Sequence, residues 1–202
     1  MKLLLVIAKD AAALSVFDLT HCGGVTLVTQ TNSAKRSLAA IANEVIDSAG
    51  GIEVFGLSHA DVVYGPGAVQ TLMAEASRGR VAGIVGRDNA GAYRCCSRPE
   101  QYDRGAGQVF AGPGVVSTLD GMACFFRPDS GLRFDSVVFD GLHCHVEDLC
   151  LQAAAWGIPS VVPLADAYHL DHPPPRPGWM DEWFAYRQRL KLKWQRVEFQ
   201  TT

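Results

Sequence analysis

The first ninety residues alternate between short apolar runs and helix-like segments, and this alternation constrains the fold more than any other feature of the sequence. Runs of apolar and β-branched residues predict strands at 3–8, 25–31, 52–58 and 81–86. Segments with helical patterns lie between them, at 10–19, 33–51 and 67–79. This order is typical of an α/β fold, in which a mostly parallel sheet is flanked by helices. The length of 202 residues suits a single domain of this class.

The second half of the chain lacks this regular alternation of strand-like and helix-like segments. Residues 87–114 are rich in Gly, Arg and Pro without clear periodicity, which predicts a long loop that is either a functional lid or disordered. Strand-like segments follow at 115–128 and 160–170. A proline-rich connector at 171–178 leads to a predicted helix over 179–197, whose apolar side carries Trp179, Trp183, Tyr186, Leu190, Trp194 and Val197.

Several polar residues stand directly after predicted strands. In open α/β sheets ligands bind at the carboxyl ends of the strands, so these residues are candidates for a site. They are Asn32, Ser33, His59, Asp61, Arg87, Asp88 and His169. Asp61 suits a divalent cation that holds a phosphate-bearing ligand, although a carboxylate there could also only cap the turn before Tyr64.

Composition and missing motifs exclude several classes of function. The sequence contains no G-x-G-x-x-G, no G-x-x-x-x-G-K-[ST] and no G-x-S-x-G, which disfavours hydride transfer, P-loop and serine hydrolase chemistry. A net charge of −3 gives no argument for nucleic-acid binding. The six cysteines form no C-x-x-C pair, and no apolar run approaches the roughly 18 residues that span a bilayer. We therefore expect reduced thiols and a cytoplasmic protein.

Two long segments resemble the family 2-like glycosyltransferases with the GT-A fold. Residues 37–75 resemble the nucleotide-sugar-binding half, in which a helix carrying an Asn leads to an apolar strand with an acidic D-x-D or His-x-Asp element. Asn43 and Asp61 fall on those positions. Residues 119–170 resemble the acceptor half, with matches in order at Arg127, Phe134-Asp135, Asp148-Leu149-Cys150-Leu151, Gly157 and His169.

The resemblance implies a single GT-A-like domain over 1–178, with a nucleotide-sugar-binding half at 1–90, an acceptor half at 115–170 and an amphipathic helix and tail at 179–202. It implies transfer of a sugar, with inversion, from a nucleoside diphosphate-sugar to a hydroxyl of a saccharide or lipid-linked acceptor. Asp61 and His169 would bind Mn²⁺ or Mg²⁺. Asn32, Ser33, Asn43, His59 and Asp61 would bind the donor. Glu147 and Asp148 would be catalytic, and Arg127, His143 and His145 would face the acceptor.

The sequence departs from the family pattern at two positions. His59 stands where a full D-x-D element has its first carboxylate, and Val146 occupies the position of the usual base, so that Glu147 or Asp148 must supply that function. These departures leave a second hypothesis open, in which the chain is an inactive nucleotide-sugar-binding or scaffold domain of the same fold. A flavodoxin-like or other α/β ligand-binding domain is a third and weaker hypothesis.

The segment "GLHCHVEDLCLQAAAWGIP" at 141–159 allows three interpretations. His143, Cys144, His145 and Cys150 could bind zinc, but they lack the paired spacing of structural zinc sites. Glu147 and Asp148 could simply stabilise the helix, because acidic side chains interact favourably with the positive end of the helix dipole. The resemblance favours the third interpretation, in which this segment contributes to the site.

The basic residues of the terminal helix also allow two interpretations. Usually such residues form a solvated face. The alternative is that residues 179–197 contact anionic lipid at a membrane surface, which would suit a lipid-linked acceptor.

Overall fold

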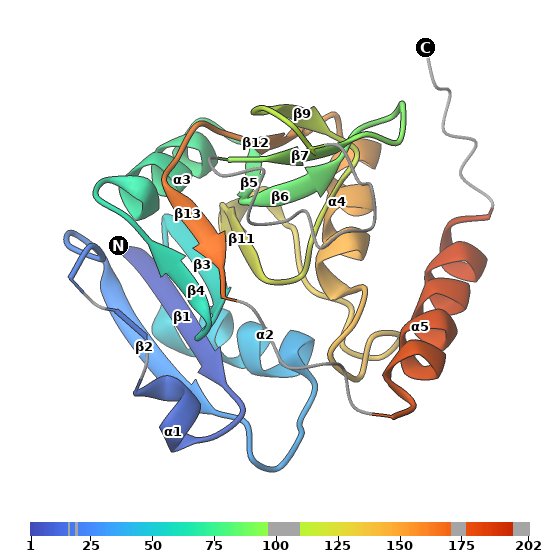
Figure 1. Cartoon of the computed structure of the whole chain (residues 1–202), viewed down its shortest axis with the longest axis horizontal. Coiled ribbons are helices and arrows are strands. Elements are labelled where there is room, and N and C mark those ends of the chain that lie inside the picture. Colours follow the sequence, from blue (N-terminus) through green and yellow to red (C-terminus); the bar gives the residue numbers. More distant parts are fainter. Residues whose placement is uncertain (16, 19, 97–109, 171–176, 196–202) are drawn as a thin grey trace.

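A seven-stranded sheet forms the centre of the molecule in the computed structural model, which describes residues 1–15, 17–18, 20–96, 110–170 and 177–195 (Figure 1). Its strands lie in the order β2 (Thr26–Thr31), β1 (Lys2–Ala8), β3 (Val54–His59), β11 (Ala123–Phe126), β5 (Val81–Gly83), β12 (Ser160–Val162) and β9 (Gly114–Val116). β11 and β9 run antiparallel to their neighbours, whereas the other five strands share one direction. The expected α/β class with a mainly parallel sheet is confirmed.

Helices pack against this sheet and bury its apolar strands. α2 (Leu38–Ala49) contacts β1, α3 (Ala68–Ser77) contacts β3, β11 and β5, and α4 (His145–Ala155) contacts β12. The short α1 (Ala11–Leu14) follows β1. Every residue of β1 after Lys2 is buried, which matches the uninterrupted apolar run expected for a strand covered on both faces.

α2 begins later than the sequence suggests. The helical pattern predicted a start at Ser33, but the N-cap is Ser37, whose hydroxyl accepts a hydrogen bond from the Ala40 N–H. The preceding residues form a loop because the Asn32 side chain bonds both backbone groups of Arg36, donating to its carbonyl at 2.7 Å and accepting from its N–H at 2.8 Å.

Three of the predicted strands are each broken into shorter strands, some of which belong to two smaller sheets. One is four-stranded, in the order β10 (Thr118–Leu119), β6 (Val85–Arg87), β7 (Tyr93–Cys95) and β8 (Phe110–Ala111), and the other pairs β13 (Ala167–His169) with β4 (Val62–Tyr64). The run 81–86 therefore splits into β5 and β6, the run 115–128 into β9, β10 and β11, and the run 160–170 into β12 and β13. Part of the predicted loop at 87–114 is strand, and its residues 97–109 lie outside the described residues.

β11 has the opposite direction to the strands beside it. Ala123 pairs with Ser58 near the end of β3, and Phe126 pairs with Phe55 near its start. The residues before β11 therefore lie at the carboxyl ends of the parallel strands, and Arg127 emerges at the opposite edge. A short 3₁₀ helix, η2 (Pro128–Ser130), follows there.

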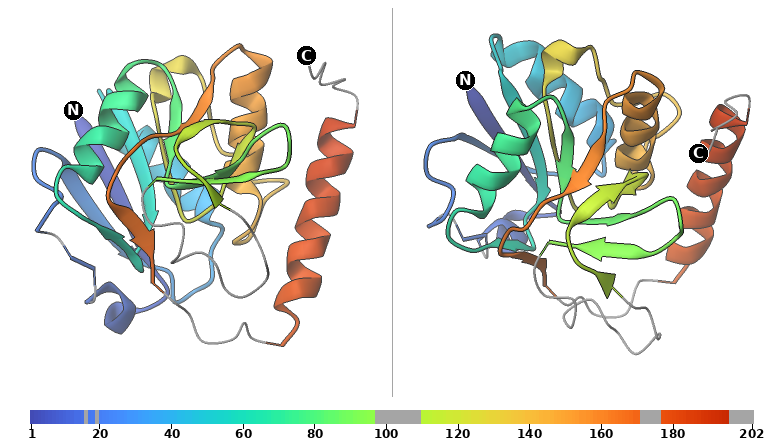
Figure 2. Two further views of the ribbon diagram at one scale, coloured as in Figure 1. Left: turned by 45° about the horizontal axis from the view of Figure 1, so that its top comes forward. Right: turned by 90° about the horizontal axis from the view of Figure 1, so that it is seen from above.

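α5 (Trp179–Trp194) lies at the margin of the molecule, alongside α4 and the loop before it (Figures 1 and 2). Its buried residues Tyr186 and Leu190 join Phe139 and Cys144 in a small apolar cluster. The predicted helix is thus present, while Val197 and the proline-rich connector at 171–176 lie outside the described residues. In the part of the chain that the structure describes, no helix is long and apolar enough to cross a membrane.

We expect Gly56→Ala to lower the free energy of unfolding by about 1–3 kcal/mol, because added atoms in a packed core force side chains from their positions. A Cβ at Gly56 in β3 would lie 2.6 Å from the Phe125 ring and 3.0 Å from Leu4. Urea denaturation measures this change. Gly23→Ala is the control, since its Cβ would meet no atom within 4 Å. Equal stability of both variants would contradict the packing described here.

Candidate functional site

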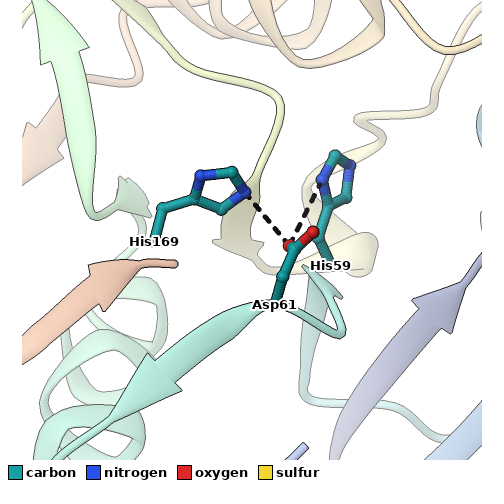
Figure 3. Close-up of side chains that lie close together, drawn as sticks. All are labelled: His59, Asp61 and His169. Carbon is teal, nitrogen blue, oxygen red and sulfur yellow. Dashed lines mark ion pairs between the residues drawn. The ribbon is translucent and has the colours of Figure 1, made fainter. Parts of the chain in front are cut away.

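Three of the predicted site residues meet at the carboxyl edge of the sheet: His59, Asp61 and His169 (Figure 3). His59 ends β3, and Asp61 follows in the turn to β4. β13 pairs antiparallel with β4 so that His169 lies opposite Val62, while the Leu170 N–H donates to the Asp61 carbonyl at 2.9 Å. This pairing brings together residues that are more than a hundred positions apart in the chain.

The side chains of this triad converge on one point. Asp61 Oδ1 lies 3.1 Å from His169 Nε2 and 4.0 Å from His59 Nδ1. One ligand atom from each residue lies within 4.8 Å of the other two. Two imidazole nitrogens and a carboxylate oxygen form a donor set that suits a first-row transition metal ion. The residues present therefore fit a divalent metal ion, and the triad could hold one.

The turn before β11 contributes a second segment to this edge. The His59 N–H donates to the Met122 carbonyl at 2.9 Å, and the Met122 N–H donates to Asp120 Oδ1 at 3.2 Å. A Cβ placed on Gly121 would lie 3.6 Å from Cε1 of His145. Residues 120–122 thus connect the triad with the start of α4.

Asp120 lies in this segment of the candidate site, although no sequence pattern had pointed to it as a site residue. The signal was present as an Asp-Gly pair, which is typical of a turn. It was hidden because the apolar residues on both sides of the pair suggested one continuous strand over 115–128.

Glu147 in the first turn of α4 has properties suited to proton transfer. The side chain is half-buried, and among the described residues its buried Oε2 has no hydrogen-bond partner. Burial raises the pKa of Glu147 to about 7, and the negative charge of Asp120 contributes to the increase. A carboxylate with a pKa near neutrality can accept a proton at physiological pH and release it again.

Asp148, predicted as catalytic together with Glu147, has a different environment. It is 0% exposed, and its carboxylate accepts hydrogen bonds from Gln152 Nε2, Lys193 Nζ and Trp194 Nε1, at 2.8–2.9 Å. Adjacent helical residues point in directions about 100° apart, so the two acids face different neighbours. Asp148 attaches α5 to α4, which leaves Glu147 as the acid better placed for chemistry.

The two histidines of this segment also differ. His145 is 0% exposed, packs its ring 5.8 Å from Phe134, and has no hydrogen-bond partner for either nitrogen among the described residues. Burial lowers the pKa of His145 to about 3, with smaller contributions from His59 and His143, so the ring is neutral. His143 instead contacts Trp179 and Tyr186 of α5, with ring centroids 5.5 and 5.8 Å away.

The predicted donor-binding residues on the first half of the chain are divided between loop and helix. Asn32 is 8% exposed and Ser33 is exposed, both in the loop at the carboxyl end of β2. The start of α2, which follows this loop, contacts the segment before α4, since the Leu38 N–H donates to the Gly141 carbonyl at 3.3 Å. Asn43, in contrast, uses its amide to bond the backbone N–H and carbonyl of Phe134.

Arg127 does not join the other predicted site residues. We expected it on the acceptor side, but the antiparallel direction of β11 places it at the amino edge of the parallel strands. There it forms an ion pair with Asp129 and lines a cavity of about 270 Å³ with Arg80 and Phe126. The zinc interpretation also lacks support, since among the described residues only the triad gathers three potential ligands of these types.

Comparisons with known proteins define the fold and nothing finer. The chain is similar to the crystal structure of A197 from STIV, with a TM-score of 0.53, 15% sequence identity and coverage of 85% of this chain and 87% of that chain. It is also similar to the inositol-1-phosphate CTP transferase from T. maritima, with a TM-score of 0.44, 14% identity and coverage of 93% and 76%. No family model and no curated protein matches the sequence. At this identity the likeness to A197 shows a shared α/β fold.

We expect Glu147→Gln to stabilise the chain at pH 8 but not at pH 4. Because the folded-state pKa lies above the ordinary value of 4.5, folding retains a proton that the unfolded chain releases, and stability falls as the pH rises from about 4.5 to 7. The substitution removes the titrating group and therefore this loss of unfolding free energy, which amounts to about 1–3 kcal/mol above pH 7.

Urea denaturation at both pH values measures this difference, and Glu53→Gln, on an exposed side chain, controls for the loss of one charge. If the free energy of unfolding had the same pH dependence in Glu147→Gln and in the wild type, folding would not raise the pKa of Glu147.

Proposed function

We propose that this chain is a metal-dependent glycosyltransferase of the GT-A type that uses a nucleoside diphosphate-sugar donor. The observation that carries the proposal is the His59–Asp61–His169 triad at the carboxyl edge of the sheet, connected through Asp120–Met122 to the first turn of α4 with Glu147. Ligands of open α/β sheets bind at this edge. The resemblance of residues 37–75 and 119–170 to family 2-like glycosyltransferases supports the same function.

In this proposal His59, Asp61 and His169 hold a divalent metal ion. Such an ion supplies charge that offsets the diphosphate and favours its departure as a leaving group. Asn32 and Ser33 lie on the loop at the carboxyl end of β2, two strands away from β3, where they would contact the donor. Two imidazole ligands favour Mn²⁺ over Mg²⁺, since Mg²⁺ prefers oxygen ligands.

Glu147 is the general base in this proposal. Its carboxylate takes the proton of the acceptor hydroxyl as that oxygen forms a bond to the anomeric carbon of the donor sugar. The bond from the anomeric carbon to the diphosphate oxygen breaks, and the electron pair leaves with the diphosphate. Attack from the side opposite the leaving group inverts the configuration. His143, which is half-buried just before α4, would lie on the acceptor side, whereas the completely buried His145 could not contact the acceptor.

The alternative is an inactive nucleotide-sugar-binding or scaffold domain of the same fold. Its support is in the sequence, because His59 replaces a carboxylate of the D-x-D element and Val146 occupies the usual base position. Both functions require metal-dependent binding of a nucleoside diphosphate, and only the transferase requires turnover.

Metal-dependent binding is the first test. We expect UDP or GDP to bind in calorimetric titrations with Mn²⁺ and to bind at least tenfold more weakly with Mg²⁺ or without a metal ion. Asp61→Ala and His169→Ala should each abolish the effect of Mn²⁺, because each removes a ligand. Asp129→Ala, at the opposite edge, is the control. No Mn²⁺-dependent binding of either nucleotide would refute both functions.

The second test concerns the base. We expect Glu147→Gln to lower turnover of a UDP- or GDP-sugar, measured as hydrolysis or transfer, by about 10²–10⁴-fold, the typical contribution of a general base. Nucleotide binding should remain within a factor of two of wild type. Unchanged turnover in this variant would exclude Glu147 as the base, whereas tight binding with no turnover of any donor in the wild type would favour the scaffold domain.

A further inference from the structure

The cations of α5 divide into two groups by their partners. Arg189 and Lys193 face the body of the protein, where Arg189 pairs with Asp140 at 2.6 Å and Lys193 pairs with Asp135 at 2.8 Å. Arg187 and Lys191 are exposed and form no ion pair within the part of the chain that the structure describes, although Arg187 lies 5.3 Å from the Trp183 ring and its charge acts on Glu147. Arg189 and Lys193 therefore pair directly with the body, Arg187 lies at the border of the docked side, and Lys191 is turned about 100° from the buried Leu190.

Apolar side chains share the outer side with these two cations. Met180 is 47% exposed, Phe184 is 52% exposed and Leu192 is 65% exposed. Residues at positions i, i+4, i+7 and i+11 lie on one side of a helix, so Met180, Phe184, Arg187 and Lys191 form a single stripe. We call this stripe the outer face of α5, and Leu192 adjoins it about 80° further around the helix, on the same side as Asp181. The acids of the helix, Asp181 and Glu182, are confined to its first turn.

We propose that the outer face of α5 binds an anionic membrane surface. Exposed Phe, Met and Leu side chains can enter the headgroup region, while Arg187 and Lys191 approach the lipid phosphates. This combination supplies both of the contributions that surface binding needs, which are apolar area and charge attraction. The inference goes beyond the proposed reaction and does not depend on it.

Two other occupants fit this face less well. In a two-fold dimer the same face would meet itself, which would bring Arg187 and Lys191 of both copies together and create repulsion. Protein interfaces are also depleted in Lys, whereas a long cationic side chain at a bilayer keeps its charge at the polar surface while its methylenes cover apolar groups. The charge of the outer face therefore favours a lipid surface over a second copy or an apolar protein partner.

The position of α5 relates the membrane surface to the candidate site. Asp148 joins Lys193 and Trp194 to α4 directly beside Glu147, and His143 contacts Trp179 at the start of α5. A membrane that holds α5 would therefore lie on the side of the molecule with the start of α4. For the proposed transferase, this position gives access to an acceptor attached to a lipid.

Sedimentation of the full chain with phospholipid vesicles tests the proposal. We expect binding to vesicles of phosphatidylcholine with phosphatidylglycerol, weaker binding at high salt, and little binding to phosphatidylcholine alone. Arg187→Gln/Lys191→Gln should weaken binding roughly fivefold for each charge removed. Met180→Gln/Phe184→Gln should weaken it by at least tenfold, because it removes most of the apolar area.

Matched changes elsewhere serve as controls. Lys2→Gln/Lys9→Gln removes the same charge, and Leu164→Gln alters an apolar residue that is 76% exposed, so neither should reduce binding by more than a factor of two. Circular dichroism checks that each variant is folded.

The proposal is overturned if the wild type does not bind anionic vesicles, if it binds neutral vesicles equally well, or if the α5 variants bind as tightly as the wild type. A concentration-dependent dimer that Phe184→Gln abolishes would instead assign the face to a second copy. Nucleotide binding is measured separately, so failure here leaves the proposed transferase intact.

Discussion

The insertion of β11 between β3 and β5 in the reverse direction determines the arrangement of the rest of the structure. The Ala123–Ser58 and Phe126–Phe55 pairs fix its register, and a one-residue shift would turn its buried side chains to the other face. This register brings Met122 to the backbone of His59 and Asp120 to the same edge as Glu147. It also removes Arg127 from that edge. The connection between the triad and the start of α4 therefore depends on the pairing of one buried strand.

Glu147 and Asp148 show how burial gives different properties to neighbouring carboxylates. Asp148 is completely buried, and its charge is compensated by Lys193 and by the donors of Trp194 and Gln152. Removal of Lys193 would leave that buried charge without its cationic partner, which is among the costliest changes in a protein interior. Glu147 has no comparable partner among the described residues, so burial raises its pKa instead. One acid stabilises the contact between two helices, and the other retains the capacity to exchange a proton.

The sequence located β1, α2 and α3 in the first half, because the apolar patterns at 3–8, 33–51 and 67–79 depend on local residues. The helix expected at 10–19 is limited to Ala11–Leu14, and β4 was not predicted. The sequence was less successful where short strands belong to different sheets. The run 81–86 has one continuous apolar pattern, yet β5 pairs with β11 and β6 pairs with β7. The choice of partner is made by distant segments, so the local pattern carries no information about it. For the same reason Asp120, in a turn between short strands, was not recognised as a site residue.

The sequence by itself determined the α/β class, the buried first strand, the order of the main helices, and the presence of polar residues after strands, since each follows from local periodicity and strand direction. Only the tertiary structure decided which of these polar residues meet. Pairing of β13 with β4 brings His169 to Asp61, and the antiparallel β11 takes Arg127 away. Likewise, the sequence showed cations on the last helix, but packing decided which of them dock and which face outward. Long-range pairing and desolvation cause these differences, and neither is encoded in any short stretch of residues.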